Sequence, residues 1–423
     1  MRQVRKNIAL KALLTLLLIA CAVAFAVSFQ FYTEALVDAF FALALAGFLI
    51  LHFRVRPDWR DIPLVLASTA IFAAVDFRFL HYPPKIMAWF SFLGLSSFLI
   101  VAVRAVWAEG EERKSLLYAW VPAALFVVSE YFASDMLAWT AAAHPKTFDP
   151  FLLSFDCSLR VQWSFIAGQA FARWSWLLVS SMIAYVGLAL PISLVYAGRL
   201  VRNQRKAFPA MLAFLITGPV GVLFYNLFPA CGPRYLLGMN FPAHPFPLAL
   251  ARTLLPVLEP ITIQGPRNAM PSLHIAWMLL AWWYSRGLSL WERAIVFAFL
   301  ALTVVATLGT GEHWFADLIV AFPFALLIQA ICAYRLGWKD VHRLTALGFG
   351  LFVTLAWLVT LRFGAQLFWT SPVIPWALTV ATVALTIIRM SDLNRAVDQA
   401  PEAADSRLSS LEAPLPEAPQ QLN

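Results

Sequence analysis

The sequence predicts an all-α integral membrane protein with about twelve transmembrane helices, and three observations support this fold class. Hydrophobic residues make up 61% of the 423-residue chain and charged residues only 13%, whereas a soluble domain carries about 25% charged residues. The mean hydropathy is +0.74. The apolar residues are gathered in runs of about 20, the length of helix that crosses a bilayer.

Each predicted span is an apolar run of roughly this length, bounded by charged or turn-forming residues. Most runs carry no ionisable side chain in their middle. The run that begins at Pro271 is short, and proline is favoured at the first helical position because its missing N–H would have had no partner. The predicted spans are residues 8–31, 33–53, 62–80, 84–103, 116–140, 174–197, 209–229, 271–286, 292–309, 314–334, 344–362 and 372–389.

The distribution of basic residues predicts the orientation. The net charge is +8, but most Lys and Arg residues lie in alternate short loops, which is a topology signal and argues against a nucleic-acid partner. Both termini are then cytoplasmic, and residues 274 and 313 face the outer side. We expect a multi-pass protein of a bacterial inner membrane, with these residues on its periplasmic face.

Three segments outside the spans have distinct compositions. Residues 141–173 mix Trp and Phe with scattered charge, which favours an amphipathic helix in the membrane interface. Residues 230–270 are rich in proline and form a long outer loop. The tail at 391–423 is polar and is predicted to be disordered. Cys157 and Cys231 both fall in outer segments, which leaves a disulfide between them open.

Two short motifs carry ionisable groups next to apolar spans, where such groups are costly and usually functional. They are Met270-Pro271-Ser272-Leu273-His274 and His313-Trp314-Phe315-Ala316-Asp317. His313 and Asp317 are four residues apart and share one helix face. A carboxylate bonded to one imidazole nitrogen fixes the tautomer and leaves the other nitrogen free to attack. This pattern indicates phosphoryl transfer through a phosphohistidine.

Phosphoryl transfer needs further groups, and the sequence offers candidates for each. His274 is expected to donate the proton to the leaving oxygen. Ser272 and the backbone N–H groups at the start of its helix are expected to bind phosphate oxygens, and Arg234 and Arg267 to add bidentate contacts. Structural roles stay open for each: hydrogen bonding for the histidines, helix capping for Ser272 and headgroup anchoring for the arginines.

Other polar residues receive weaker assignments. Glu130 and Asp135 are expected to pair with an arginine or to contact a headgroup. Tyr225 and Asn226 are candidates for the lining of the pocket. The remaining four are predicted to be solvated loop residues, namely His144, His244, Asp149 and Asp156.

The two motifs resemble those of the type 2 phosphatidic acid phosphatase superfamily, and most closely its inositol phosphorylceramide synthase-like branch. That branch uses Met-Pro-Ser-Leu-His and a His-aromatic-x-x-Asp element. The resemblance implies that His313 is the nucleophile, Asp317 its orienting partner and His274 the general acid, with no metal or other cofactor. The chain departs from the superfamily pattern in its phosphate-binding elements: Gly232-Pro233-Arg234-Tyr235 stands near the usual Lys-x6-Arg-Pro motif, and Ala306 and Thr307 replace a Ser-Arg pair.

The resemblance also implies a division of the chain. A six-span phosphatase-like core would cover residues 116–335, with a four-span extension at 1–115 and a two-span extension at 336–390. The expected function is a lipid phosphatase or lipid phosphotransferase at the outer leaflet. Its partners would be the membrane, a lipid phosphate or phospholipid and an acceptor alcohol. The alternative is a non-catalytic lipid transporter or scaffold built on the same core.

Overall fold

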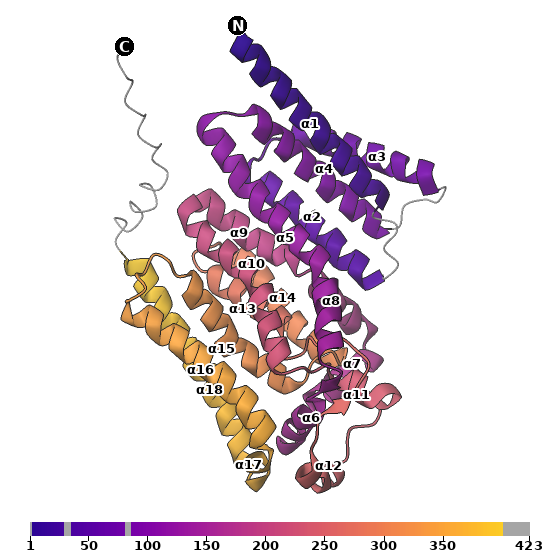
Figure 1. The fold of residues 1–423 in the computed structure, drawn as a ribbon, viewed down its shortest axis with the longest axis vertical. Coiled ribbons are helices and arrows are strands. Elements are labelled where there is room, and N and C mark those ends of the chain that lie inside the picture. Colours follow the sequence, from indigo (N-terminus) through magenta and orange to yellow (C-terminus); the bar gives the residue numbers. More distant parts are fainter. Residues whose placement is uncertain (1, 29–34, 81–85, 401–423) are drawn as a thin grey trace.

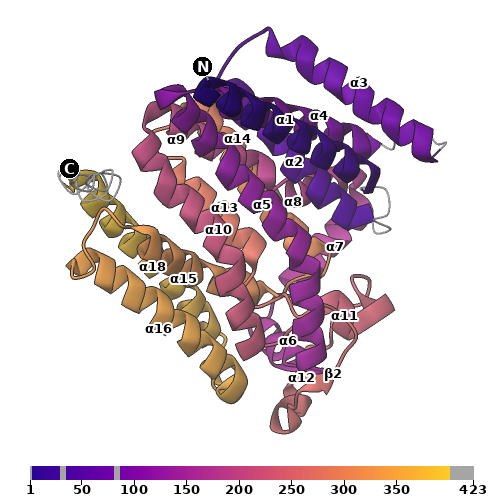
Figure 2. The same cartoon turned by 45° about the horizontal axis from the view of Figure 1, so that its top comes forward.

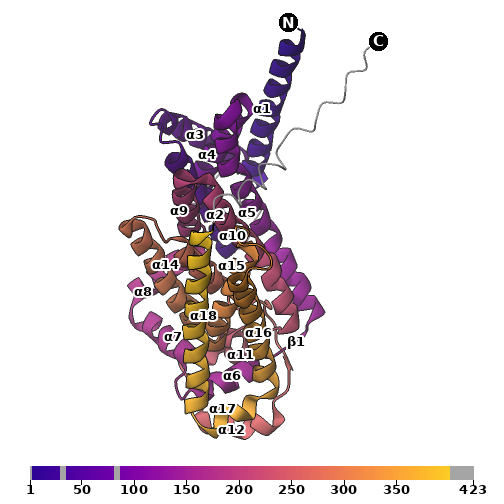
Figure 3. The ribbon, with the colours of Figure 1, turned by 90° about the vertical axis from the view of Figure 1, so that its left-hand side faces the viewer.

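The computed structural model describes residues 2–28, 35–80 and 86–400, and these form a bundle of helices (Figure 1). A short antiparallel sheet joins β1 (Lys146–Thr147) to β2 (Ile261–Thr262), with Lys146 opposite Thr262. The sheet lies toward the end of the bundle that carries α12 and α17 (Figure 3).

The N-terminal helices form one side of the bundle, opposite the C-terminal helices (Figure 2). They are α1 (Arg2–Ser28), α2 (Ala35–Val55), α3 (Asp61–Leu80) and α4 (Ile86–Trp107). Helix α4 packs against α1, α2 and α3, and α2 joins this layer to the rest of the chain through α5 and α9. The C-terminal side consists of α16 (Val341–Phe363), α17 (Ala365–Thr370) and α18 (Val373–Gln399).

The middle of the chain supplies the remaining helices. They are α5 (Gly110–Ala143), α6 (Asp149–Ser158), α7 (Trp163–Arg173), α8 (Ser175–Val186), α9 (Ala189–Arg202), α10 (Gln204–Leu227), α11 (Pro233–Leu237), α12 (Leu248–Leu254), α13 (Leu273–Tyr284), α14 (Leu290–Gly309) and α15 (Phe315–Cys332), with the 3₁₀ turns η2 (Gly238–Asn240) and η3 (Leu255–Val257).

Helix α15 is the centre of the fold. It contacts α6, α10, α13, α16 and α18, and 83% of its span is buried, against 28% for α18. A helix that is apolar on all sides is expected at such a position, and α15 has apolar residues around its whole circumference. Its N-terminus carries the second histidine motif, so that motif is anchored to the most buried of the candidate membrane spans in the described chain.

The long apolar helices indicate a multi-pass membrane protein. Within residues 2–28, 35–80 and 86–400, seven helices are long and apolar enough to cross a membrane, or eight if the bent pair α8 and α9 counts as one span. A helix covers each of the twelve predicted segments, but several are too short or too polar to qualify, so the count of twelve is not confirmed. The segment 174–197 is not one straight helix, because the chain bends by 52° between α8 and α9.

Two predicted boundaries are wrong. Helix α13 begins at Leu273 with Ser272 as its N-cap residue, and Pro271 precedes it. Helix α18 continues to Gln399, so residues 391–399 are not disordered. They are helical because Leu393 and Asn394 are buried and the Asn394 amide oxygen accepts from Gln329 Nε2 on α15 (2.7 Å). Residues 401–423 lie outside the described chain.

The orientation inferred from the basic residues is testable by thiol labelling. Met239 is 98% exposed in the loop predicted to be outside, and Asn203 is exposed in the loop predicted to be inside. In a Cys21→Ser background, which removes the exposed cysteine, we expect an impermeant maleimide to label Met239→Cys but not Asn203→Cys in intact cells. Both should react after permeabilisation, and labelling of Asn203→Cys before it would contradict the orientation.

Candidate active site

The backbone of His313 is held in a turn between α14 and α15. The His313 N–H donates to Thr307 O (3.2 Å), and the Ser164 hydroxyl donates to His313 O (3.2 Å). Gly311 allows the turn because its φ is +73°, a conformation that favours glycine. The turn delivers the imidazole into the protein, where the residue is only 1% exposed.

The two ring nitrogens of His313 have different surroundings. Nδ1 lies 3.0 Å from Ala269 O and 3.5 Å from Asp317 Oδ2, whereas Nε2 lies 3.3 Å from Ser272 Oγ. A carbonyl oxygen can only accept, so Nδ1 carries a hydrogen, and in the neutral imidazole Nε2 then presents its lone pair. Asp317 was expected to fix this tautomer, but the backbone carbonyl of Ala269 makes the shorter contact.

Asp317 connects the two motifs. Its Oδ2 accepts the Trp314 N–H at the start of α15 (2.7 Å), where a helix N-terminus favours negative charge. Its backbone carbonyl accepts the Ser272 N–H (3.2 Å). Its Oδ1 is buried and has no hydrogen-bond partner. Asp317 therefore holds the Ser272 turn against the His313 turn while it stays within reach of the His313 ring.

His274 faces His313 from the first turn of α13. The ring centroids are 6.5 Å apart, with the planes inclined by 66°. The other face of His274 stacks on Tyr185 of α8 at 4.0 Å and 11°, which restricts the ring to one orientation. The structure thus brings together the four residues predicted from the two motifs, which are Ser272, His274, His313 and Asp317.

Arg234 reaches the same region through Glu312. Its Nη1 donates to Glu312 Oε1 (2.6 Å), with the arginine side chain 46% and the glutamate 14% exposed. The Arg234 N–H donates to Gly311 O (3.1 Å), and the Tyr235 hydroxyl donates to Glu312 Oε2 (3.2 Å). Glu312 directly precedes His313, so the guanidinium lies at the edge of the site with a carboxylate as its partner. The sequence reasoning did not consider Glu312.

Arg267 has its donors directed to the protein. It is 3% exposed, and its Nε and Nη2 donate to His144 O (2.8 Å) and Pro145 O (2.9 Å). Its Nη1 donates to Gly265 O (2.5 Å) and lies 3.4 Å from Cys231 Sγ. This guanidinium joins the segment at His144 and Pro145 to the segment at Cys231 and Gly265. Cys157 and Cys231 are both free and buried, so they do not form the disulfide that the sequence left open.

Two carboxylates of α6, those of Asp149 and Asp156, hold the backbone around the site in place. The prediction that they are solvated is wrong. Asp149 and Asp156 are 0% and 2% exposed. Asp149 accepts Trp314 Nε1–H (2.8 Å) and the N–H groups of Cys231 (3.0 Å) and Gly232 (2.8 Å). Asp156 Oδ2 accepts the Phe315 N–H (3.0 Å). The two residues therefore position the start of α15 and the segment that leads to Arg234.

The sequence did contain a signal for these carboxylates. They are seven residues apart and fall on one helix face, within a decapeptide that is otherwise mostly apolar. Nearly all of α6 is buried, so it packs under the site and is not the interfacial helix that was predicted. Burial raises the pKa of both Asp149 and Asp156, although their hydrogen bonds lower it. The pKa of Asp156 is raised to about 8.

The weaker assignments concern polar residues around the site, and the structure agrees with some of them and not with others. Tyr225 is 3% exposed within the core, and Asn226 Oδ1 lies 3.0 Å from His144 Nε2, so His144 is not simply solvated. His244 is exposed, as predicted for a loop residue. Asp135 is exposed, and the side chain of Glu130 lies outside the described part of the structure.

The raised pKa of Asp156 predicts a pH-dependent stability. The pKa rises from 3.8 in the unfolded chain to about 8 in the folded protein, so folding favours the protonated form. Stability should fall as the pH rises from about 4 to about 8 and level off above that. Asp156→Asn keeps an acceptor for Phe315 N–H without a charge. Thermal melting in detergent should show the variant more stable than wild type above pH 8, and equal melting temperatures there would contradict this account.

Comparison with known families gives one match, to the PAP2 superfamily, over residues 150–331. The match covers less than half of the chain but contains both histidine motifs, Arg234 and Arg267. It supports a membrane phosphatase-type protein and agrees with the superfamily resemblance of the two motifs. It does not distinguish the inositol phosphorylceramide synthase-like branch. No curated protein and no solved structure matched the chain.

Proposed function

We propose that this protein is a metal-independent phosphoric ester hydrolase or phosphotransferase that acts on a lipid through a phosphohistidine at His313. The observation that carries the proposal is the arrangement of the His313 ring. Its Nδ1 hydrogen is directed to Ala269 O, so Nε2 keeps its lone pair, and His274 lies across a gap of 6.5 Å between centroids. A nucleophile and a proton donor facing each other suit in-line displacement at phosphorus.

In the first step, His313 Nε2 forms a bond to phosphorus as the bond from phosphorus to the leaving oxygen breaks. His274 gives its proton to that oxygen. The imidazole of His313 becomes positively charged, and the carboxylate of Asp317, 3.5 Å from Nδ1, stabilises that charge. Because Nδ1 and Asp317 are buried, this electrostatic contribution is screened less than it would be in water.

In the second step, an oxygen nucleophile attacks the phosphohistidine and His274 removes its proton. The P–N bond breaks and the neutral His313 is restored. Water as the nucleophile makes the enzyme a phosphatase. The hydroxyl of a lipid or polyol makes it a transferase, as the inositol phosphorylceramide synthase-like resemblance implies.

The equatorial phosphate oxygens need donors in both steps. Ser272 Oγ lies beside Nε2, and the first N–H groups of α13 lack helical acceptors and attract anions. Arg234 is a half-exposed cation that is paired with Glu312, the residue before His313. A bound phosphate would accept hydrogen bonds from some nitrogens of that guanidinium. Between turnovers, Glu312 would keep the guanidinium in position. We assign Arg267 to shaping the outer loops, since its donors already have acceptors there.

The alternative is a non-catalytic lipid transporter or scaffold, and one assay distinguishes it from an enzyme. Purified protein is incubated in detergent with a panel of lipid phosphates and phospholipids, with and without candidate alcohols. Phosphate release that depends on His313 supports a phosphatase, and a new phosphate ester of the added alcohol supports a transferase. Absence of both products across the panel would favour the non-catalytic alternative.

The proposed chemistry also predicts insensitivity to chelators. Within residues 2–28, 35–80 and 86–400, no three His, Cys, Asp or Glu side chains are arranged to hold a metal ion, and the proposed steps use only histidine, arginine and backbone donors. We expect EDTA to leave the initial rate unchanged. Vanadate should inhibit, because it adopts the five-coordinate shape of the transition state. Loss of activity in EDTA that Mg²⁺ restores would contradict the mechanism.

A further inference from the structure

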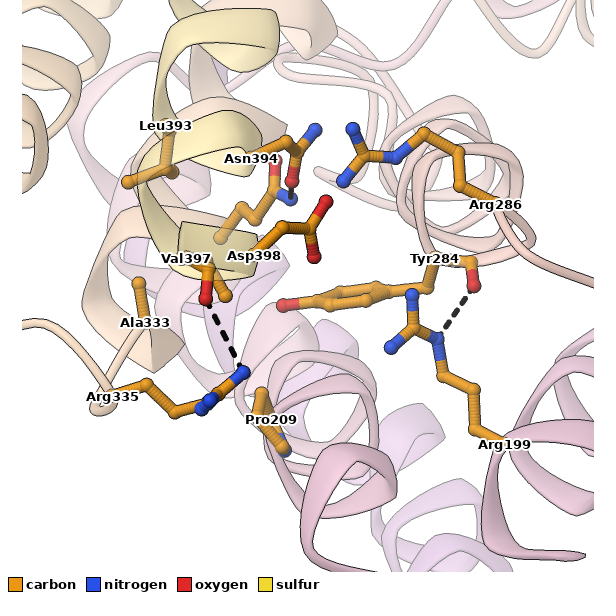
Figure 4. A pocket seen from close by; sticks show the side chains of 11 residues that line it. Arg199, Pro209, Tyr284, Arg286, Ala333, Arg335, Leu393, Asn394, Val397 and Asp398 are labelled. Atoms are coloured by element: carbon orange, nitrogen blue, oxygen red, sulfur yellow. Dashed lines mark hydrogen bonds between the residues drawn. The ribbon is translucent and has the colours of Figure 1, made fainter. Parts of the chain in front are cut away.

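A cavity lies at the far end of the core helices from the histidine pair. It has a volume of about 50 Å³ and opens to solvent, and Figure 4 shows the side chains around it. Tyr284 ends α13 and Gln329 lies in the last turn of α15. At about 1.5 Å per residue, they lie about 15 Å along α13 from His274 and about 18 Å along α15 from Asp317. The cavity is therefore separate from the catalytic site.

Three arginines from different parts of the chain converge on this cavity (Figure 4). Arg199 comes from α9, Arg286 follows α13 and Arg335 follows α15. Arg199 Nε donates to Tyr284 O (2.6 Å), and Arg286 Nε donates to Trp283 O (3.1 Å). These bonds use one nitrogen of each guanidinium and orient it. Asp398 of α18 is the one carboxylate among the lining residues, so the lining carries a net positive charge.

Two buried polar groups on the cavity wall lack partners. Arg335 is 8% exposed, and although its Nη1 and Nη2 donate to Val397 O (3.2 Å) and Ala400 O (3.1 Å), its Nε has no acceptor. Gln329 is 4% exposed, and its Oε1 has no donor. Unpaired buried polar groups are costly. Both atoms have almost no accessible surface, so a ligand with both an acceptor and a donor, such as a hydrogen phosphate, would satisfy them after the side chains turn toward the cavity.

The ordinary explanation for arginines at this end of the core is membrane topology. Arginines that serve only to set the membrane topology extend into water or to headgroups along the surface. Here the three side chains instead surround one space and are half-buried or buried. The planar guanidinium binds phosphate oxygens in pairs, and several donors on one space suit a phosphate better than a single carboxylate.

We propose that this cavity binds a phosphate group, on the membrane face opposite the histidine pair. The ligand is either free inorganic phosphate or the phosphate of a lipid headgroup, since the cavity opens to solvent at the end of the helices. This assignment does not depend on the chemistry at His313. Because α13 and α15 connect the two sites, occupancy of the cavity would also stabilise the helices that carry the catalytic motifs.

Hydrogen–deuterium exchange of the full-length protein tests the site directly. Residues 393–399 of α18 line the cavity through Asn394, Val397 and Asp398, so their amides report on it locally. In uncharged detergent, sodium phosphate is compared with sodium chloride at equal ionic strength. At ten times its Kd, phosphate should slow exchange in residues 393–399 by about tenfold. A parallel comparison uses nanodiscs of phosphatidylcholine with and without phosphatidylglycerol. Protection by sodium phosphate alone identifies free phosphate as the ligand, and protection by phosphatidylglycerol alone identifies a lipid headgroup.

Three variants make the test specific. Arg286→Gln should abolish the protection, because it removes a cation that lines the cavity; the hydrogen bond of Arg286 to Trp283 O is local to the end of α13 and partly buried. Arg395→Gln is the matched control: it removes a charge from the same end of α18, but its side chain is 71% exposed and pairs with Asp392, so protection should persist. Asp398→Asn should strengthen protection. Absence of protection in both arms, or full protection in Arg286→Gln, would overturn the proposal.

Discussion

We expect His313→Asn to lower turnover by roughly 10⁴-fold or more, the scale seen when a covalent nucleophile is removed. The asparagine amide can still donate to Ala269 O, as Nδ1 does at 3.0 Å, but nothing replaces Nε2. The variant therefore removes the attacking atom with little change to the turn. Initial rates on the best substrate of the lipid panel measure the effect.

The loss of turnover can be assigned to the missing nucleophile only if the His313→Asn protein folds. His313 is 1% exposed, so a substitution there could disturb folding, and the melting temperature of the variant in detergent is measured alongside its activity. The matched control is His144→Asn, which changes another histidine on the same side of the core whose ring contacts Asn226. That variant should keep its activity. A folded His313→Asn protein within tenfold of wild type would exclude His313 as the nucleophile.

We expect the second large effect from His274→Gln, and we expect it to depend on the leaving group. With an alkyl ester, loss of the proton donor should lower the rate by about 10²–10⁴-fold. With p-nitrophenyl phosphate, whose leaving group needs no proton, the first step should be nearly unaffected. Glutamine retains part of the stacking surface that Tyr185 contacts at 4.0 Å.

The comparison between the two esters separates catalysis from structure. A structural role for His274 would lower both rates by the same factor, because a displaced turn harms attack on either substrate. A burst of p-nitrophenol followed by slow turnover would instead show that the first step survives and that the second, where His274 acts as base, has become limiting. Equal loss on both esters would contradict its role as general acid.

The helices could be predicted from the sequence because apolar runs of about 20 residues are a strong and local signal. The break between α8 and α9 could not, since the run 174–197 carries no charged residue and the bend follows the end of α8 at Val186, with Gly187 as its C-cap residue. The helical extension at 391–399 was missed for a similar reason. Its polar residues look solvated, but Asn394 is buried against Gln329 of α15 and Val397 O accepts from Arg335, contacts that depend on tertiary packing.

The candidate catalytic residues could be identified from the sequence, but their hydrogen-bonding partners could not. His274, His313 and Asp317 were recognised because ionisable groups beside a membrane core are unusual. The acceptor for His313 Nδ1 is a backbone carbonyl, which no side-chain pattern reveals. Asp149 and Asp156 lie more than 150 residues before the α15 turn that they support, so their burial depends on tertiary packing. The pairing of Arg234 with Glu312 likewise arises from two glycine-containing turns, at Gly232 and Gly311.

The most direct measurement is a search for the covalent intermediate. Protein is mixed with ³²P-labelled substrate, quenched in alkali within the first turnover, digested and mapped by mass spectrometry. The account predicts a phosphoryl group on Nε2 of His313 that is stable in base and labile in acid. It should accumulate in His274→Gln, which is slow in the second step, and be absent in His313→Asn. Label on Ser272, or turnover by the wild type with no labelled protein at any time, would contradict a phosphohistidine mechanism.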